Sequence, residues 1–155
     1  KVLDTRKTTP GLRTLEKYAV RMGGGTNHRI GLYDAALVKD NHIEATGSIA
    51  EAVKAVRRHA PFMAKVEVEA GNLKQVQEAI DAGADVIMLD NMNYAQMAEA
   101  VQLVNKRAGV EASGGITFET IRQVAETGVD YISSGALTHS APVVDFNMKI
   151  TMNVG

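Results

Sequence analysis

The chain lacks several features that mark common classes of protein. There is no cysteine among its 155 residues, which excludes a disulfide framework, a zinc ribbon, an iron–sulfur cluster and a thiol nucleophile. Its 17 lysines and arginines are balanced by 18 aspartates and glutamates, giving a formal net charge of -1. That balance disfavours the broad cationic field with which proteins bind nucleic acid or the surface of a membrane.

Long apolar runs are missing as well. The longest cover only a few residues, as at 86–89, whereas a helix that spans a bilayer needs about 20. The first residues have no apolar core of the kind found in signal peptides, so we expect a cytoplasmic protein. The chain also starts without methionine and inside a predicted strand, and we therefore expect it to be part of a longer protein.

Short apolar runs alternate along the chain with segments of helical periodicity. Six strands are predicted, at residues 2–3, 36–38, 64–68, 85–89, 109–112 and 131–133, and a seventh is considered at 143–150. Asn72, Asn93 and Thr117 are predicted to cap the N-termini of helices, and Gly83 and Gly128 to end them. Alternating strands and helices indicate a parallel sheet with right-handed crossovers.

The ends of the predicted strands decide between two kinds of parallel sheet. An open doubly wound sheet gathers its site at one switch point, whereas a (β/α) barrel takes site residues from many strand ends. Every predicted strand is followed by a polar residue: Asp4, Lys39, Glu69, Asp90, Ser113 and Ser134. We therefore predict an α/β fold, a TIM-like (β/α) barrel with six to seven parallel strands, which is incomplete or open because a complete barrel needs about 250 residues.

Cationic residues follow the first predicted strands. Arg6 and Lys7 lie in a turn of threonines, proline and glycine and offer a planar fork and a point charge to an anion. His28 and Arg29 come after three glycines, which allow a close backbone approach. Lys39 ends a predicted strand. If its ammonium group points over the barrel mouth, its natural partner is an anion. Taken singly, these residues have ordinary alternatives: a solvated basic loop, a structural turn and a snorkelling lysine.

Carboxylates follow the next two predicted strands. Glu67 and Glu69 alternate with two valines, so both glutamates face the barrel axis if the valines pack under the helices. Glu69 and Asp90 can then converge from neighbouring strands on one magnesium ion or on sugar hydroxyls. For Glu67 we expect a salt bridge with Lys65 or with another interior cation, because an unpaired buried carboxylate is costly.

Two turns rich in glycine and serine follow the last strands. Backbone N–H groups in such turns form the phosphate site of many barrels. The residues concerned are Ser113, Gly114, Gly115, Ser134, Gly135 and Ala136. Together with the cations and carboxylates they predict a site for a multiply anionic small substrate and a phosphorylated, magnesium-bound sugar. A metabolite-binding scaffold without activity is the alternative.

In this order, the motifs resemble those of the quinolinate phosphoribosyltransferase family. They are Asp-Thr-Arg-Lys-Thr-Thr-Pro-Gly-Leu-Arg (4–13), Gly-Gly-Gly-x-Asn-His-Arg-x-Gly-Leu-x-Asp (23–34), Val-Lys-Asp-Asn-His (38–42), Val-Glu-Val-Glu (66–69), Leu-Asp-Asn (89–91), Glu-Ala-Ser-Gly-Gly-Ile (111–116) and Ser-x-Gly-Ala-Leu-Thr (133–138). The resemblance implies transfer of phosphoribose from 5-phosphoribosyl-1-pyrophosphate to quinolinate, with loss of pyrophosphate and CO2, giving nicotinate mononucleotide for NAD biosynthesis.

The resemblance also implies a role for each matching residue. Those that would hold the quinolinate carboxylates are Arg6, Lys7, His28, Arg29 and Lys39. Glu69 and Asp90 would hold the ribose and Mg2+, and with Lys39 they are the predicted catalytic residues. The two turns at 113–115 and 134–136 would take the 5-phosphate. His139, just beyond the second turn, is given no role.

Only the barrel domain of the family, over residues 1–150, is matched, with 151–155 as a tail. The resemblance implies an N-terminal α/β sandwich domain outside this chain, and a dimer or larger homo-oligomer in which the partner's N-terminal domain adds an arginine to the site. The nearest alternative is a paralogue linked to molybdenum uptake, which Thr9, Asn27 and Lys39 argue against. A catalytically inactive phosphate-binding barrel is the other, and the retained Lys39, Glu69 and Asp90 argue against it.

Overall fold

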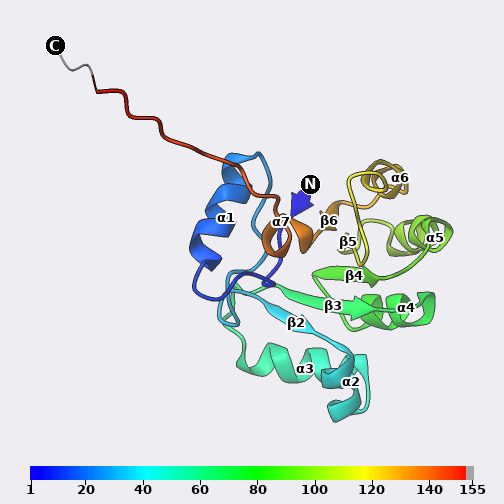
Figure 1. The fold of residues 1–155 in the computed structure, drawn as a ribbon. Coiled ribbons are helices and arrows are strands. Elements are labelled where there is room, and N and C mark those ends of the chain that lie inside the picture. The colour runs from blue at the N-terminus through cyan, green and yellow to red at the C-terminus, as the bar shows by residue number, and fades with distance from the viewer. Residues whose placement is uncertain (153–155) are drawn as a thin grey trace.

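Six parallel strands form one curved sheet in the computed structural model, which describes residues 1–152 (Figure 1). The strands are β1 (Val2–Leu3), β2 (Ala36–Val38), β3 (Val66–Ala70), β4 (Val86–Asp90), β5 (Gly109–Ser113) and β6 (Tyr131–Ser133). Their order in the sheet is β1-β6-β5-β4-β3-β2. Because β1 and β2 are the two edges and do not pair, the barrel is open along one seam, which confirms the predicted open TIM-like α/β fold.

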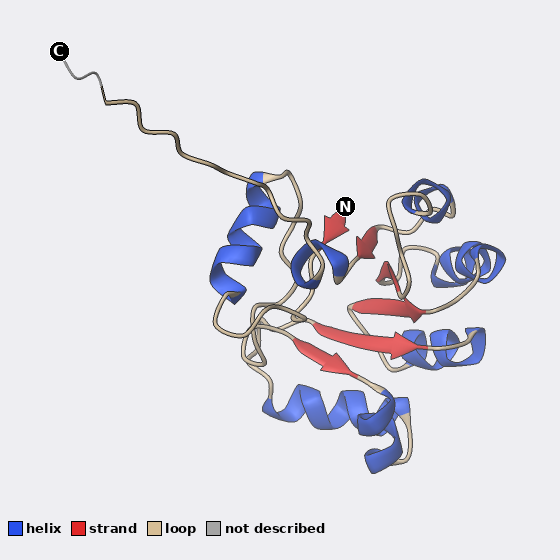
Figure 2. Ribbon diagram, viewed as in Figure 1, coloured by secondary structure: helices blue, strands red, loops and turns tan. Residues whose placement is uncertain are grey.

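Helices follow the strands: α1 (Arg13–Met22), α2 (Asp40–Thr46), α3 (Ile49–His59), α4 (Leu73–Asp81), α5 (Tyr94–Val104), α6 (Ile121–Glu126) and α7 (Ala136–His139). Of these, α3, α4, α5 and α6 pack against the strands and cover the outer face of the sheet (Figure 2). The side chains of Asn72 and Asn93 accept hydrogen bonds from backbone N–H groups in the first turns of α4 and α5, as predicted. Gly83 and Gly128 both have a positive φ after their helices, which also agrees with the prediction.

The predicted cap Thr117 is wrong. Helix α6 begins at Ile121, and the backbone N–H of Thr117 instead donates to the hydroxyl of Thr120. The threonine therefore closes a turn that precedes the helix, a competing local use of hydroxyl groups.

The hydrophobic core lies between the sheet and the outer helices. Val66 and Val68 of β3 are buried in it with Ile87 and Leu89 of β4, and burying each such side chain stabilises the fold by about 1.5–3 kcal/mol. Because side chains alternate along a strand, this packing turns Glu67 and Glu69 to the inner face. The sequence prediction for these two glutamates is thus confirmed in its geometry.

One buried carboxylate holds the chain segment that lies at the open seam. The Asp4 side chain, at the end of β1, is fully buried and pairs with the ammonium group of Lys17 from α1. It also accepts a hydrogen bond from the backbone N–H of His28 (2.8 Å) and one from the side-chain amide of Asn27. Residues 23–35, which we call the seam segment, thereby lie between β1 and β2 without forming a helix, and Thr26 makes an isolated parallel bridge with Leu3 of β1.

The expected seventh strand at 143–150 does not form. Residues 141–152 run away from the barrel as an extended chain (Figure 1), with no strand beside them to pair with. Their apolar side chains are exposed, among them Phe146, Met148 and Ile150. Of the predicted tail at 151–155, residues 153–155 lie outside the described part of the chain. Within residues 1–152, none of the helices has the length and hydropathy to span a membrane.

Replacing Lys17 with methionine should strongly destabilise the protein. The change leaves the Asp4 carboxylate buried without its cation, and breaking one side of a buried pair costs about 3–5 kcal/mol. The free energy of unfolding from urea titration measures the effect. Lys54→Met is the matched control, because Lys54 and its partner Glu51 are both exposed and such a pair contributes about 0–1 kcal/mol. Equal losses in the two variants would contradict the role given to Asp4.

Candidate functional site

A cavity of about 550 Å³ opens at the carboxyl ends of the strands. It brings together residues that are far apart in the sequence, from the turn after β1 to the end of β6. Its polar lining includes Arg6, Lys7, His28, Arg29, Lys39, Glu69, Asp90, Asn91, Glu111, Ser113 and Ser133. All predicted quinolinate-binding and magnesium-binding residues therefore lie in one cavity.

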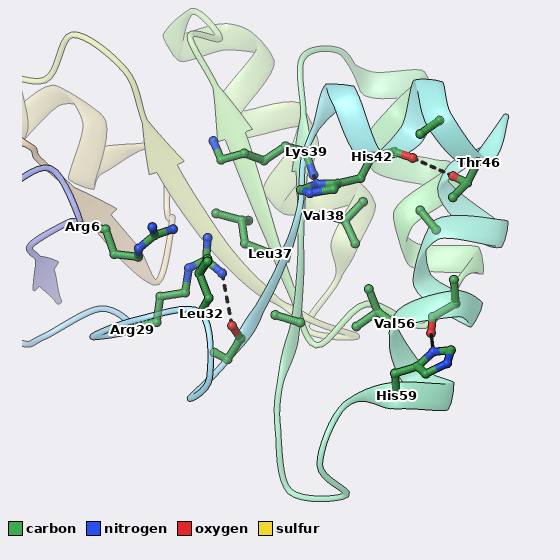
Figure 3. A pocket seen from close by; sticks show the side chains of 15 residues that line it. Arg6, Arg29, Leu32, Leu37, Val38, Lys39, His42, Thr46, Val56 and His59 are labelled. Atoms are coloured by element: carbon green, nitrogen blue, oxygen red, sulfur yellow. Dashed lines mark hydrogen bonds between the residues drawn. The ribbon is translucent and has the colours of Figure 1, made fainter.

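The cations occupy one side of this cavity. Figure 3 shows Arg6 and Arg29 pointing toward each other and toward Leu37, with Lys39 nearby. The same residues also line an adjoining cavity of about 560 Å³, which extends along the free edge of β2 to α2 and α3. The missing contact between β1 and β2 thus leaves the cationic side open toward a largely apolar groove.

Neither guanidinium group forms a salt bridge with a carboxylate of residues 1–152. Burial and the neighbouring charge of Arg6 lower the pKa of Arg29. The Arg29 side chain donates to the backbone carbonyl of Ala35 (3.2 Å), whereas Nε of Arg6 is buried and has no hydrogen-bond partner. A planar carboxylate would satisfy such donors in pairs.

The carboxylates lie on the opposite side. Glu69 pairs with Met88 in the register of β3 and β4, and Asp90 pairs with Ser113 in the register of β4 and β5. Glu69 and Asp90 are therefore diagonal neighbours on adjacent strands. Oε2 of Glu69 accepts from Lys39 Nζ at 2.6 Å, and Asp90 accepts from the side-chain amide of Asn91 at 3.0 Å. Lys39 thus connects the cationic side to the acidic side.

The donor chemistry of Glu69 and Asp90 fits Mg2+. This ion prefers hard oxygen ligands and commonly uses one or two carboxylates together with the phosphates of its substrate. Both side chains are only half-buried, so phosphate oxygens and water can complete the coordination. Among residues 1–152 the one cluster of at least three metal-binding side chains lies elsewhere, at His28, Glu67 and Glu111.

The two turns predicted to bind phosphate lie together beyond the acidic side. Gly114 and Gly115 have φ angles of 102° and 60°, which side chains rarely allow. A Cβ on Gly114 would also collide with the side chain of Asn91. Ser134 links the turns by donating from its hydroxyl to the carbonyl of Ile116 at 3.3 Å. Of the six predicted phosphate-binding residues, only Ser113 lines the cavity.

His28 forms a cluster that the motifs did not reveal. Its Nε2 lies 3.0 Å from Glu67 and 3.5 Å from Glu111, which reach it from β3 and β5 across the barrel interior. We call these three residues the His28 clamp. The expected partner of Glu67 is therefore His28, an interior cation, and not Lys65. The pattern of inward-facing residues on β3 and β5 places both glutamates inside, but only the fold shows that His28 reaches them.

Protonation of the His28 clamp is strongly shifted. Burial alone would lower the pKa of His28, but hydrogen bonds and charge from Glu111 and Glu67 outweigh it and raise this pKa from 6.5 to about 10. Burial, reinforced by the charge of Glu111, also raises the pKa of Glu67. His28 is therefore more fully protonated at neutral pH than a free imidazole would be, and its charge removes part of the cost of burying two carboxylates.

The chain matches, over residues 1–149, the family described as "Quinolinate phosphoribosyl transferase, C-terminal domain". It belongs to this family. The sequence is 54% identical to the probable nicotinate-nucleotide pyrophosphorylase [carboxylating] of Bacillus subtilis, over 99% of this chain and 53% of that protein. A protein of Synechocystis with the same description is 52% identical over 97% of this chain and 52% of its own length.

A solved structure agrees with these matches. The NadC protein of Streptococcus pyogenes superposes with a TM-score of 0.92 and 53% identity, covering 96% of this chain and 52% of that one. The family named from the sequence motifs is thus confirmed. The chain spans about half the length of the relatives that it matches.

Raising the pH should weaken the protein through the His28 clamp. A group with a raised pKa stabilises the fold fully below its ordinary pKa and loses this contribution as the pH rises through the folded value. The contribution of His28 is therefore complete below about pH 6.5 and is lost toward about pH 10. The raised pKa of Glu67 acts in the same direction from a lower pH.

The melting temperature measured across this range should fall less in His28→Gln than in the wild type. His59→Asn is the control, since His59 is exposed at the end of α3. Parallel curves for the wild type and His28→Gln would show that the pKa of His28 is not raised in the folded protein.

Proposed function

We propose that this chain is the barrel half of an enzyme that transfers phosphoribose from 5-phosphoribosyl-1-pyrophosphate to quinolinate. The products are nicotinate mononucleotide, pyrophosphate and CO2. One observation carries the proposal: a single cavity has Arg6, Arg29 and Lys39 on one side and Glu69 and Asp90 on the other. The cations suit the two carboxylates of quinolinate, and the carboxylates suit the ribose, on which positive charge develops as pyrophosphate leaves. The names of the relatives, which state this activity, support it.

Quinolinate would bind on the cationic side. Its two carboxylates need several donors, and Arg6, Lys7, Arg29 and Lys39 supply guanidinium and ammonium groups around one space. The buried, unpartnered Nε of Arg6 supports this placement, because a buried donor without a partner costs free energy that a bound carboxylate would restore. His28 lies at the floor of the same space.

The sugar pyrophosphate would bind on the acidic side, with its 5-phosphate at the turns 113–115 and 134–136. Glu69 and Asp90 would hold Mg2+, which when bound stabilises the negative charge of the departing pyrophosphate. As the bond from C1 of the ribose breaks, positive charge develops on the sugar. The two carboxylates are fixed beside it before the reaction, so their electrostatic stabilisation needs no rearrangement.

The remaining chemistry asks little of the side chains. The ring nitrogen of quinolinate attacks C1 of the ribose, and no covalent enzyme intermediate is needed. Loss of CO2 from the pyridine nucleotide leaves the electron pair of the broken C–C bond on the ring carbon, which then takes up a proton from water, so no base is required. What the cavity must supply is orientation of the dianion, which the fixed cations provide.

We further propose that the site is completed within a homo-oligomer, by an arginine from the partner's N-terminal domain. Two observations support a missing neighbour. Helix α1 buries Lys17 but exposes Leu15, Tyr18 and Met22, which is the reverse of an ordinary surface helix. The tail exposes a second apolar set, and monomers rarely leave large apolar patches uncovered. We place the reaction in the cytoplasm, as expected for a biosynthetic enzyme with charged, phosphorylated substrates.

The decisive experiment compares residues 1–155 alone with the same residues preceded by the N-terminal half of the Bacillus subtilis relative. We expect the short chain to bind phosphate or pyrophosphate weakly, to self-associate, and not to convert quinolinate. The extended protein should convert quinolinate but not nicotinate, as measured by formation of nicotinate mononucleotide. Equal turnover by the short chain would show that the partner's arginine is dispensable. No turnover by either, with phosphate still bound, would favour an inactive phosphate-binding barrel.

Lys39→Ala should weaken the binding of quinolinate far more than that of the sugar pyrophosphate. A charge-assisted hydrogen bond to a carboxylate contributes about 1.5–3 kcal/mol, so KM for quinolinate should rise by about tenfold to a hundredfold. The exposed Lys74 of α4 provides the control variant Lys74→Ala. An unchanged KM for quinolinate would remove Lys39 from the site.

Glu69→Gln and Asp90→Asn should lower kcat while leaving the fold intact. The amides keep the shape of the side chains but neither neutralise a cationic sugar nor hold Mg2+ well. Turnover is measured at saturating magnesium, and circular dichroism checks the fold. Wild-type kcat in both variants would contradict the assignment of the ribose and the metal ion.

A further inference from the structure

The His28 clamp lies at the floor of the cavity. His28 and Glu111 contribute to the lining, and the side chains of His28, Glu67 and Glu111 are 13%, 8% and 2% exposed. Nε2 of His28 faces both carboxylates, and Nδ1 lies 2.7 Å from the backbone nitrogen of Arg29, whose N–H points at it. Nδ1 accepts this hydrogen bond only in the neutral ring. The protonated ring carries a hydrogen on Nδ1, so a direct bond from His28 to a bound carboxylate is the alternative that the experiments below separate.

The clamp instead fixes the seam segment from within. This segment has no helix of its own, and its backbone is tied at His28 to Asp4 on one side of the ring. On the other side the ring itself is held from β3 and β5. Arg29 follows directly, and its guanidinium is placed beside Arg6 and over the cavity. Movement of the His28 ring would therefore displace the backbone from which Arg29 extends.

We infer that Glu67 and Glu111 are positioning residues, which hold His28 so that Arg29 meets a carboxylate of the substrate. The inference rests on the proposed function, since it names the group that receives the substrate's carboxylate. It assigns His28 a role exerted through Arg29, in place of a direct bond from the imidazole to quinolinate.

The second oxygen of each glutamate points to a competing explanation for the clamp, which is a bound metal ion. Oε1 of Glu67 and Oε1 of Glu111 are buried and have no partner among residues 1–152. One atom from each of His28, Glu67 and Glu111 could also serve as a metal ligand, since these atoms lie within 4.8 Å of one another. A resident divalent cation would replace the hydrogen bonds to the ring, and so it is the competing explanation.

The test uses Glu67→Gln and Glu111→Gln in the full-length protein that carries this chain. Both changes keep the size of the side chain and weaken a charge-assisted bond to His28. We expect KM for quinolinate to rise by about tenfold, the effect of losing one such bond, with KM for the sugar pyrophosphate nearly unchanged. Glu99→Gln, on the exposed side of α5, is the matched control. A merely structural role would lower the melting temperature without separating the two KM values.

A double-mutant cycle with Arg29→Ala then tells the two roles of His28 apart. If the clamp acts through Arg29, the glutamate changes should raise KM by less than about twofold once Arg29 is gone, because coupled residues are not additive. If the full tenfold effect persists, His28 binds the substrate itself and the inference is wrong. Should one glutamate variant fail to fold, the other supplies the cycle.

Two further results would overturn the inference. One is an unchanged KM for quinolinate in both variants, while the wild type turns over. The other is one divalent metal ion per chain in the purified wild type, lost from both variants, as measured by elemental analysis. Failure of the proposed function looks different, because then the wild type itself does not convert quinolinate.

Discussion

The buried pairing of Asp4 with Lys17 is the interaction on which the site depends. The two strands that border the seam, β1 and β2, do not pair, so the seam segment is held by its own contacts, of which this ion pair is the most deeply buried. Asp4 also binds the backbone at His28. Its energetic worth as an ion pair is small against its desolvation cost. Its importance lies in fixing an irregular segment at the point where the barrel leaves a gap.

That gap explains the distribution of charge in the mouth. A closed barrel would shield Arg6 and Arg29 behind backbone, but here they stand at an edge, near each other, with no carboxylate bonded to either among residues 1–152. Lys39, in contrast, is bonded to Glu69.

Much of this could be predicted from the sequence. Period-two alternation placed Glu67 and Glu69 inside, asparagine caps located the starts of α4 and α5, and glycines located the ends of α4 and α6. The failures have physical reasons. Residues 143–150 have the pattern of a strand but pair with neither free edge of the sheet, because a strand's pattern does not encode its pairing partner. The buried Lys17 and the contacts of His28 join residues across the barrel, and no local pattern in one sequence reports such distances.

The exposed apolar side chains follow from the same reasoning. Amphipathicity fixes which side of α1 is apolar, but not whether the barrel or another body covers it. In this chain Lys17 turns inward because Asp4 must be neutralised, and that rotation sends Leu15, Tyr18 and Met22 outward. The electrostatic demand of one buried carboxylate therefore creates an apolar surface beside the seam. This exposed surface is the observation on which the proposed association with a neighbouring domain or subunit rests.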